Sequence, residues 1–333
     1  MKKPTRLILA LLGVLPSSAV FACASCGCSI NSDWSAQGLS AMAGWSLDVR
    51  YDYLNQNKLW AGTSSISPTA AAAVTVPKTG EPAEVEKYTK NHYLTATLDY
   101  NDGDSWGVGV SLHFIKRSHS TLGVGSDGTT VDPENGAYTS SGSGLGDVRV
   151  VGRYFGFSDE RNFGVQLGLK LPTGKKNQIA DDGSLTDVDP GLQRGTGTTD
   201  LIVGAYYFGD LAADWGYFAQ ATFQAALNHS TMAGGSYKPG NNVSASVGAR
   251  YKGFESFIPT LQINARYAKT DSGDAADTFA TGGKLVYLTL GAILPISEKF
   301  VPYANVQLPI YQNVNGIQLT PKYTVSVGAK YSF

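Results

Sequence analysis

Three cysteines near the start of the chain are the residues whose type and spacing best suit chemistry. They lie in the sequence Cys23-Ala-Ser-Cys26-Gly-Cys28. Two of them would form a disulfide in an oxidising compartment, three would suit a soft metal such as Cu(I) because thiolates select soft ions, and Cys23 alone would suit a lipid anchor. Gly27 stands where c-type haem attachment needs histidine. No second C-x-x-C completes a tetrahedral zinc site.

The segment around these cysteines indicates export. A basic start, a short apolar run from Leu7 to Leu15 and small residues after it are typical of a secretory signal peptide. The run is too short to span a bilayer as a helix, which takes about 20 residues. The expected organisation is a signal peptide at 1–22 cleaved after Ala22 or Ala24, a periplasmic cysteine segment at 23–40, and one folded domain at 41–333.

The elements that follow are strands with a two-residue period. In the final segment the apolar residues at every second position are Tyr323, Val325, Val327, Ala329, Tyr331 and Phe333. Trp45 to Tyr53 alternates in the same way, and the pattern recurs about twelve times with no helical segment to cover it. A strand with one apolar and one polar face separates two environments. Lipid outside and water inside predict a transmembrane up-and-down antiparallel β-barrel of about 12 strands.

The connections between these strands alternate in length, with long loops at Asn55–Lys87 and Thr173–Thr199 and short turns such as Asn101–Asp104. Outer-membrane barrels have short periplasmic turns and long outer loops, so an even strand number places both termini in the periplasm. The aromatic final residue Phe333 resembles the assembly signal of bacterial outer-membrane proteins, which would engage the barrel-assembly machinery. A soluble two-sheet sandwich is the alternative fold.

The polar faces of the predicted strands would line the lumen of the barrel. Nine basic residues against five acidic ones leave a modest positive excess, which would favour anions. The alternative is that these charges pair across strands and fill a narrow lumen. The predicted solute path contains Asp48, Arg50, Asp52, Asp147, Arg149, Arg153, Arg250 and Arg266.

Other functions receive little support from the composition. The net charge of −1 gives no basis for nucleic-acid binding. His113 is expected on the lumenal face, yet no G-x-S-x-G context accompanies it, so we do not expect an enzyme. No cofactor is expected apart from the alternative of a soft metal at the cysteines.

Three glycine-containing motifs carry a family resemblance that covers roughly residues 140 to 333. They are Gly144-Leu145-Gly146-Asp147, Leu169-Lys170-Leu171-Pro172-Thr173-Gly174-Lys175 and Gly195-Thr196-Gly197-Thr198-Thr199-Asp200. The chain is similar to the meta-pathway phenol-degradation outer-membrane family, a relative of the fatty-acid and aromatic uptake barrels. The resemblance implies a channel or transporter in the Gram-negative outer membrane. The chain departs from the fatty-acid transporters because no plug domain precedes the first strand.

Two functions from different classes follow. The first is a channel or transporter that lies in the lipid bilayer and passes small solutes through a mildly basic lumen. The second is a barrel that anchors or docks a periplasmic metal or redox partner through Cys23–Cys28.

Overall fold

A computed structural model describes residues 43–77, 80, 82–122, 137, 139–181, 183 and 187–333. The predicted signal peptide, its cleavage positions and the segment containing Cys23, Cys26 and Cys28 lie outside these residues.

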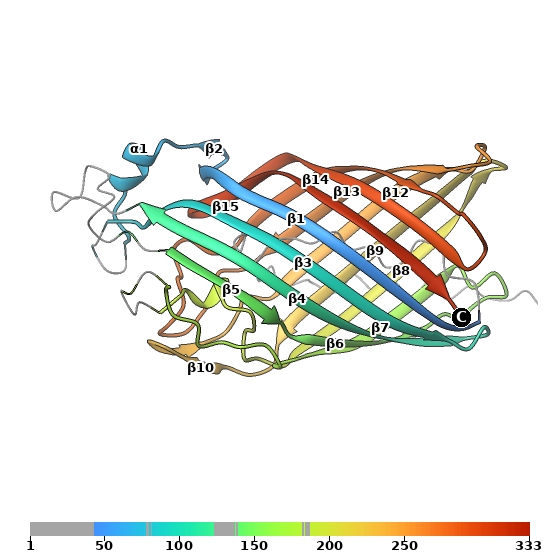
Figure 1. The fold of residues 1–333 in the computed structure, drawn as a ribbon, viewed down its shortest axis with the longest axis horizontal. Coiled ribbons are helices and arrows are strands. Elements are labelled where there is room, and N and C mark those ends of the chain that lie inside the picture. Colours follow the sequence, from blue (N-terminus) through green and yellow to red (C-terminus); the bar gives the residue numbers. More distant parts are fainter. Residues whose placement is uncertain are drawn as a thin grey trace, which may run out of the picture.

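The described chain consists almost entirely of β-strands (Figure 1). Its first strands are β1 (Gly44–Gly62), β2 (Ser64–Ser65), β3 (Val85–Asn101), β4 (Trp106–Leu122), β5 (Thr139–Leu145), β6 (Val148–Tyr154) and β7 (Phe163–Leu171). The others are β8 (Asp200–Ala212), β9 (Trp215–Ala226), β10 (Ser230–Met232), β11 (Gly235–Tyr237), β12 (Asn242–Tyr251), β13 (Ile258–Ala268), β14 (Gly283–Ile293) and β15 (Phe300–Ser332).

The strands form a closed antiparallel ring. Its order is β1-β3-β4-β6-β7-β8-β9-β12-β13-β14-β15, and β15 pairs back onto β1, with Ser46 opposite Ser332. A closed ring has no free edges. This confirms the predicted barrel and excludes the two-sheet sandwich.

The strand β15 crosses the wall twice. Its 33 residues would extend about 110 Å if straight, far more than the roughly 25 Å apolar band of such barrels. Residues 303–314 pair with β14, residues 314–332 pair with β1, and the Ser332 amide donates to the Lys299 carbonyl. The chain reverses at Asn315-Gly316, where Gly316 has a φ of 53°. Eleven strand elements therefore make twelve crossings, the even number that an antiparallel ring requires.

Side chains alternate between the two faces of the wall as predicted. On β3, Leu94 and Leu98 are exposed on the outside, whereas Asn91 and Thr95, which lie on the other face of the strand, are buried. Buried polar residues and exposed apolar ones are the reverse of a soluble protein, and they suit a wall between lipid and a polar lumen.

Several strands are longer than the sequence indicates. The predicted loop Asn55–Lys87 is wrong at both ends, because β1 continues to Gly62 and β3 begins at Val85. Polar residues such as Gln56 and Asn91 pair with the neighbouring strands here, with register shifts on both sides of Gln56 in its pairing with β15. Backbone pairing therefore continues beyond the apolar residues. Between them, Ser67 caps the five-residue helix α1 (Pro68–Ala72), which packs into an apolar cluster with Leu59 and Leu319. Neither this helix nor any other in the described part is long and apolar enough to cross a membrane.

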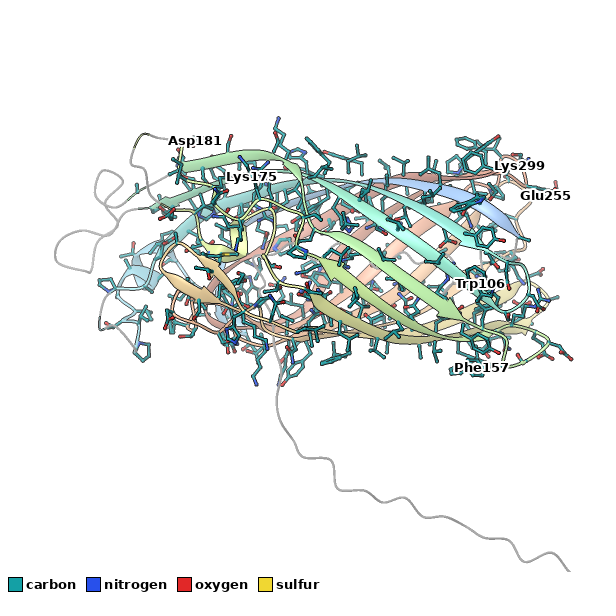
Figure 2. All side chains as sticks on the ribbon, turned by 90° about the horizontal axis from the view of Figure 1, so that it is seen from below. Trp106, Phe157, Lys175, Asp181, Glu255 and Lys299 are labelled. Atoms are coloured by element: carbon teal, nitrogen blue, oxygen red, sulfur yellow. The ribbon has the colours of Figure 1, made fainter. Side chains whose placement is uncertain are left out.

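The two ends of the barrel differ. The long connections and α1 lie at one end, and the short turns lie at the other with the C-terminus (Figure 1). Figure 2 shows Trp106, Phe157, Glu255 and Lys299 at the short-turn end, opposite Lys175 and Asp181. Aromatic pairs follow this rim, including Tyr100–Trp106 at 5.4 Å and Trp215–Tyr251 at 5.0 Å between ring centroids. Such a belt marks a membrane–water interface.

The three motifs that carry the family resemblance meet in one network. The Asp147 carboxylate accepts hydrogen bonds from the amides of Gly174 and Thr196, each at 3.0 Å. The Lys170 ammonium lies 3.3 Å from Asp147 and 2.9 Å from Asp200. We call Asp147, Lys170, Thr196, Thr198 and Asp200 the Asp147–Lys170 network.

This network lies where the wall is interrupted. The same crossing includes β5, which precedes Gly146–Asp147 in the chain. Among the described residues, β5 pairs with β4 along one edge and with no strand along the other. The loop after β7 lies along the other edge of β5. The Asp181 amide and the Arg194 guanidinium donate to the carbonyls of Thr139 and Ser143 there. At the base of this loop, Gly174 and Gly195 approach so closely that a Cβ on Gly195 would lie 2.4 Å from the Gly174 carbonyl oxygen.

We expect Asp147→Ala to destabilise the barrel by about 3–5 kcal/mol, the usual cost of breaking a buried ion pair. The change removes one of the two carboxylates beside buried Lys170 and the acceptor of two backbone amides. Urea unfolding of the protein in lipid vesicles measures this free energy.

The control for this prediction is Asp104→Ala. Asp104 pairs with Arg161 in an exposed turn, where its side chain is 82% exposed, and the expected change is within about 0.5 kcal/mol. Equal losses in the two variants would contradict a structural role for the network.

Candidate functional site

The inner face of the wall carries paired charges. Arg50 on β1 donates to Asp52 at 3.0 Å, and Asp52 also accepts a hydrogen bond from Ser326 on the neighbouring strand. Asp48 accepts a hydrogen bond from the Tyr303 hydroxyl at 3.1 Å. These contacts place the three predicted path residues of β1 in a network across the β1–β15 seam.

A second pair lies towards the short-turn rim. Arg153 on β6 forms a bidentate pair with Asp99 on β3, with distances of 2.7 and 2.8 Å. A Cβ on Gly107 of the intervening strand would lie 2.6 Å from this guanidinium. Gly107 thus leaves space for the pair to bridge across β4.

Arg149 differs from these residues. Its side chain is exposed and, among the residues that the structure describes, makes no hydrogen bond or ion pair. Its charged neighbours include Arg266 on β13 and Arg50 on β1. These strands are not adjacent to β6 in the ring, so the three guanidinium groups face one another through the lumen. The carboxylates of Asp200 and Asp147 are also charged neighbours of Arg149. Both of these carboxylates form ion pairs with Lys170.

The other two predicted path residues also lie on the inner side. Arg250 is buried beside Gly216, where an added Cβ would lie 2.6 Å from the Arg250 Nε. Arg266 is half-buried on β13. Asp147 belongs to the wall network described above rather than to the open lumen. The eight predicted path residues therefore differ in their contacts, and their place in a solute path stays a prediction.

The loop between β7 and β8 enters the lumen. Arg117, inward on β4, donates to the carbonyls of Gly191 and Gln193 at 3.4 and 3.3 Å. The same guanidinium donates to Asn91 and to the Tyr93 hydroxyl on β3. The short 3₁₀ helix η1 (Pro190–Leu192) is thus attached to the inner face of β3 and β4.

The loop is also held internally. The Gln193 side chain donates to the carbonyls of Gln178 and Val188 and accepts from the Gln178 amide at 2.9 Å. Val188 and Leu192 are 3% exposed. A well-bonded segment of this kind narrows the lumen instead of leaving it open.

The inner wall has an apolar portion next to this polar one. Leu285 and Tyr287 on β14 form a cluster with Val314, and Trp60 packs against it. The side chains of Leu285 and Tyr287 point inward from β14, a strand with apolar residues on both faces. The lumen is therefore lined by guanidinium groups on one part and by aromatic and aliphatic groups on another.

Carboxylates gather at the long-loop end, beyond the lipid-facing residues. The Glu86 side chain accepts a hydrogen bond from the Leu319 amide and lies 3.9 Å from the His119 ring. Its burial, together with the negative charges of Asp189 and Asp277, raises its pKa to about 7. Enclosure by the surrounding protein also raises the pKa of Asp189 to about 6. The carboxylates of Glu86, Asp189 and Asp277 thus lie near one another at this mouth.

Sequence reasoning missed Arg117 and the acidic mouth. The inward direction of Arg117 could have been predicted. Arg117 lies four residues after His113 on β4, and the two-residue alternation already placed His113 on the lumenal face. Glu86 was assigned to a loop, so its direction was not predicted. Within the described residues, no three histidine, cysteine, aspartate or glutamate side chains lie close enough together to hold a metal ion.

Comparison with known proteins gives a relationship in fold. No protein-family model matches the chain, and no curated protein matches it by sequence. The crystal structure of the COG4313 outer membrane channel from Pseudomonas putida F1 superposes with a TM-score of 0.65 at 12% identity, covering 92% of this chain and 100% of that one.

Two other solved barrels are similar at a lower level. A Pseudomonas aeruginosa FadL homologue gives a TM-score of 0.45 at 10% identity, covering 95% of this chain and 100% of that one. The P. putida toluene transporter TodX gives 0.43 at 10% identity, covering 89% and 92%. The similarity to the COG4313 outer membrane channel alone shows a shared fold.

Proposed function

We propose that this protein is an outer-membrane channel that passes small solutes and prefers anions. The observation that carries the proposal is the guanidinium of Arg149, which has Arg50 and Arg266 as charged neighbours across the lumen. Its acidic neighbours Asp200 and Asp147 form ion pairs with Lys170. Rings of basic side chains bias a pore towards anions. The fold shared with the COG4313 channel supports transport as the class of function.

The paired charges set the limits of this proposal. Arg50, Arg153 and Lys170 each lie within 3.0 Å of a carboxylate, so they contribute little net field to the path. The selectivity would therefore depend mainly on Arg149. The nine basic and five acidic residues counted in the sequence overstate the net positive charge along the path. The solute would pass Arg149 and the loop held by Arg117.

Arg149→Ala should lower the ratio of anion to cation permeability by roughly fivefold. One charge at close range in water is worth about 1 kcal/mol, which corresponds to that factor. Reversal potentials of the purified protein in planar bilayers under a KCl gradient measure the ratio.

The matched control is Arg161→Ala, which removes an exposed arginine from a turn at the short-turn end. It should leave the ratio unchanged. The absence of single-channel steps in the unmodified protein would overturn the channel itself. A partner interaction lost on Cys26→Ser and Cys28→Ser would then favour the docking function.

Arg117→Ala should widen the conducting path. The substitution removes the hydrogen bonds that attach η1 to β3 and β4, and bonds to a charged group are each worth about 1.5–3 kcal/mol. We expect a larger single-channel conductance with more frequent fluctuations. Arg117→Lys, which keeps the charge and loses the forked geometry, should fluctuate in the same way with unchanged selectivity.

External acidification from pH 8 to pH 5 should increase anion conductance. The pKa values of Glu86 and Asp189 are raised to about 7 and 6, so both carboxylates become neutral within this range and the mouth loses negative charge. A raised acid pKa also means that the folded mouth binds protons more readily than the unfolded chain, so its stability rises as the pH falls.

Conductance measured with acidification on the long-loop side alone tests this prediction. Glu86→Gln should remove part of the pH response and should raise conductance at pH 8. An unchanged titration in that variant would contradict the assignment of the response to the mouth.

A further inference from the structure

One side of the outer surface carries lysines directly above the lipid-facing residues. Lys90 on β3 and Lys116 on β4 are both exposed and continue the outward series that includes Leu94 and Phe114. The apolar residues of these strands end at this level, so both ammonium groups lie at the boundary between the apolar band and the long-loop end.

The strand register brings these two lysines together. His92 lies opposite Lys116, and Lys90 lies opposite Ser118. Lys90 and Lys116 are therefore diagonal neighbours on one face, at about 7–8 Å by the usual sheet geometry. The Lys90 ammonium also lies 4.8 Å from the centre of the Tyr88 ring.

Aromatic residues fill the space beside them. The Tyr51 hydroxyl lies 2.7 Å from Nδ1 of His92, and the ring centroids of Tyr53 and His92 are 5.2 Å apart. We call Tyr51, Tyr53, Lys90, His92 and Lys116 the Lys90–Lys116 patch. Tyrosines at this depth are typical of the membrane–water interface.

The charge of this surface is one-sided. At the described outward positions of β1, β3 and β4 around the patch, namely 51, 53, 55, 88, 90, 92, 112, 114, 116 and 118, there is no aspartate or glutamate. On the opposite wall, the outward residues at the same end of β7, β8, β9 and β12 are Leu171, Leu201, Ala225 and Val243. Lys284 on β14 is a further exposed cation at this end. The patch differs from it because two lysines adjoin there with no acid at the outward positions around them.

We propose that the Lys90–Lys116 patch binds the phosphate groups of a phosphorylated glycolipid in the outer leaflet of the outer membrane. Its acyl chains would lie along Leu94, Leu112 and Phe114, which are 43–46% exposed directly below. Two lysines at diagonal spacing suit a headgroup with more than one phosphate, and lysines at a membrane surface attract anionic lipids. The inference rests on the long-loop end facing outward.

Binding of diphosphoryl lipid A to the purified full-length protein in detergent micelles tests the proposal. Native mass spectrometry would count bound lipid for the unmodified protein, for Lys90→Gln with Lys116→Gln, and for the control Lys175→Gln with Lys299→Gln. We expect the first double variant to bind about tenfold more weakly or worse and the control to bind normally. The heat-dependent gel shift of each variant verifies that it is folded.

Several outcomes would overturn the proposal. These are full binding by the Lys90 and Lys116 variant, equal binding of the lipid after removal of its phosphates, and displacement of the lipid by an equal concentration of inorganic phosphate. A Lys90→Arg with Lys116→Arg variant, which keeps both charges, should retain the lipid. Loss of binding in that variant would also contradict an electrostatic site.

Discussion

Peptide groups that cross lipid need partners within the protein, because the surrounding hydrocarbon offers none. The pairing of β1 with β15 meets this requirement by closing the ring. Closure fixes an even number of crossings and an alternation of faces, so the inner face becomes the place for the polar residues. The charged lumen and the lipid-facing residues are both consequences of that one seam.

Among the described residues the wall is interrupted beside β5, and this interruption accounts for the three glycine-containing motifs as parts of the architecture. Where β5 has a strand partner on one side only, the loop after β7 supplies hydrogen bonds to its other edge. Asp147 and Lys170 hold the base of that loop, and Arg117 holds its middle. A loop fixed at both places can pass through the lumen without leaving the sheet edge exposed.

The sequence predicts the barrel and the inward direction of Arg50, Arg149 and Arg153, because the two-residue period assigns each side chain to a face. It does not predict that Arg153 pairs with Asp99 on β3, since such pairs depend on strand register and on the small residue between them. The lengths of β1 and β3 were also missed. The ends of these strands at the long-loop end are held by backbone pairing among polar residues. No alternation of apolar and polar residues marks these ends in the sequence, so they were not predicted. The only sequence signal for the chain reversal at Asn315-Gly316 is the glycine itself.

The seam between β1 and β15 also bears on how the molecule forms. It joins segments that are almost the whole described chain apart, so its contacts are of the most non-local kind and are expected to form slowly. Until they form, the sheet has two long edges whose peptide groups are unpaired, one along β1 and one along β15. The form of this protein most prone to aggregation is thus the sheet just before closure. Its two unpaired edges can bind strands of other chains as readily as they bind each other.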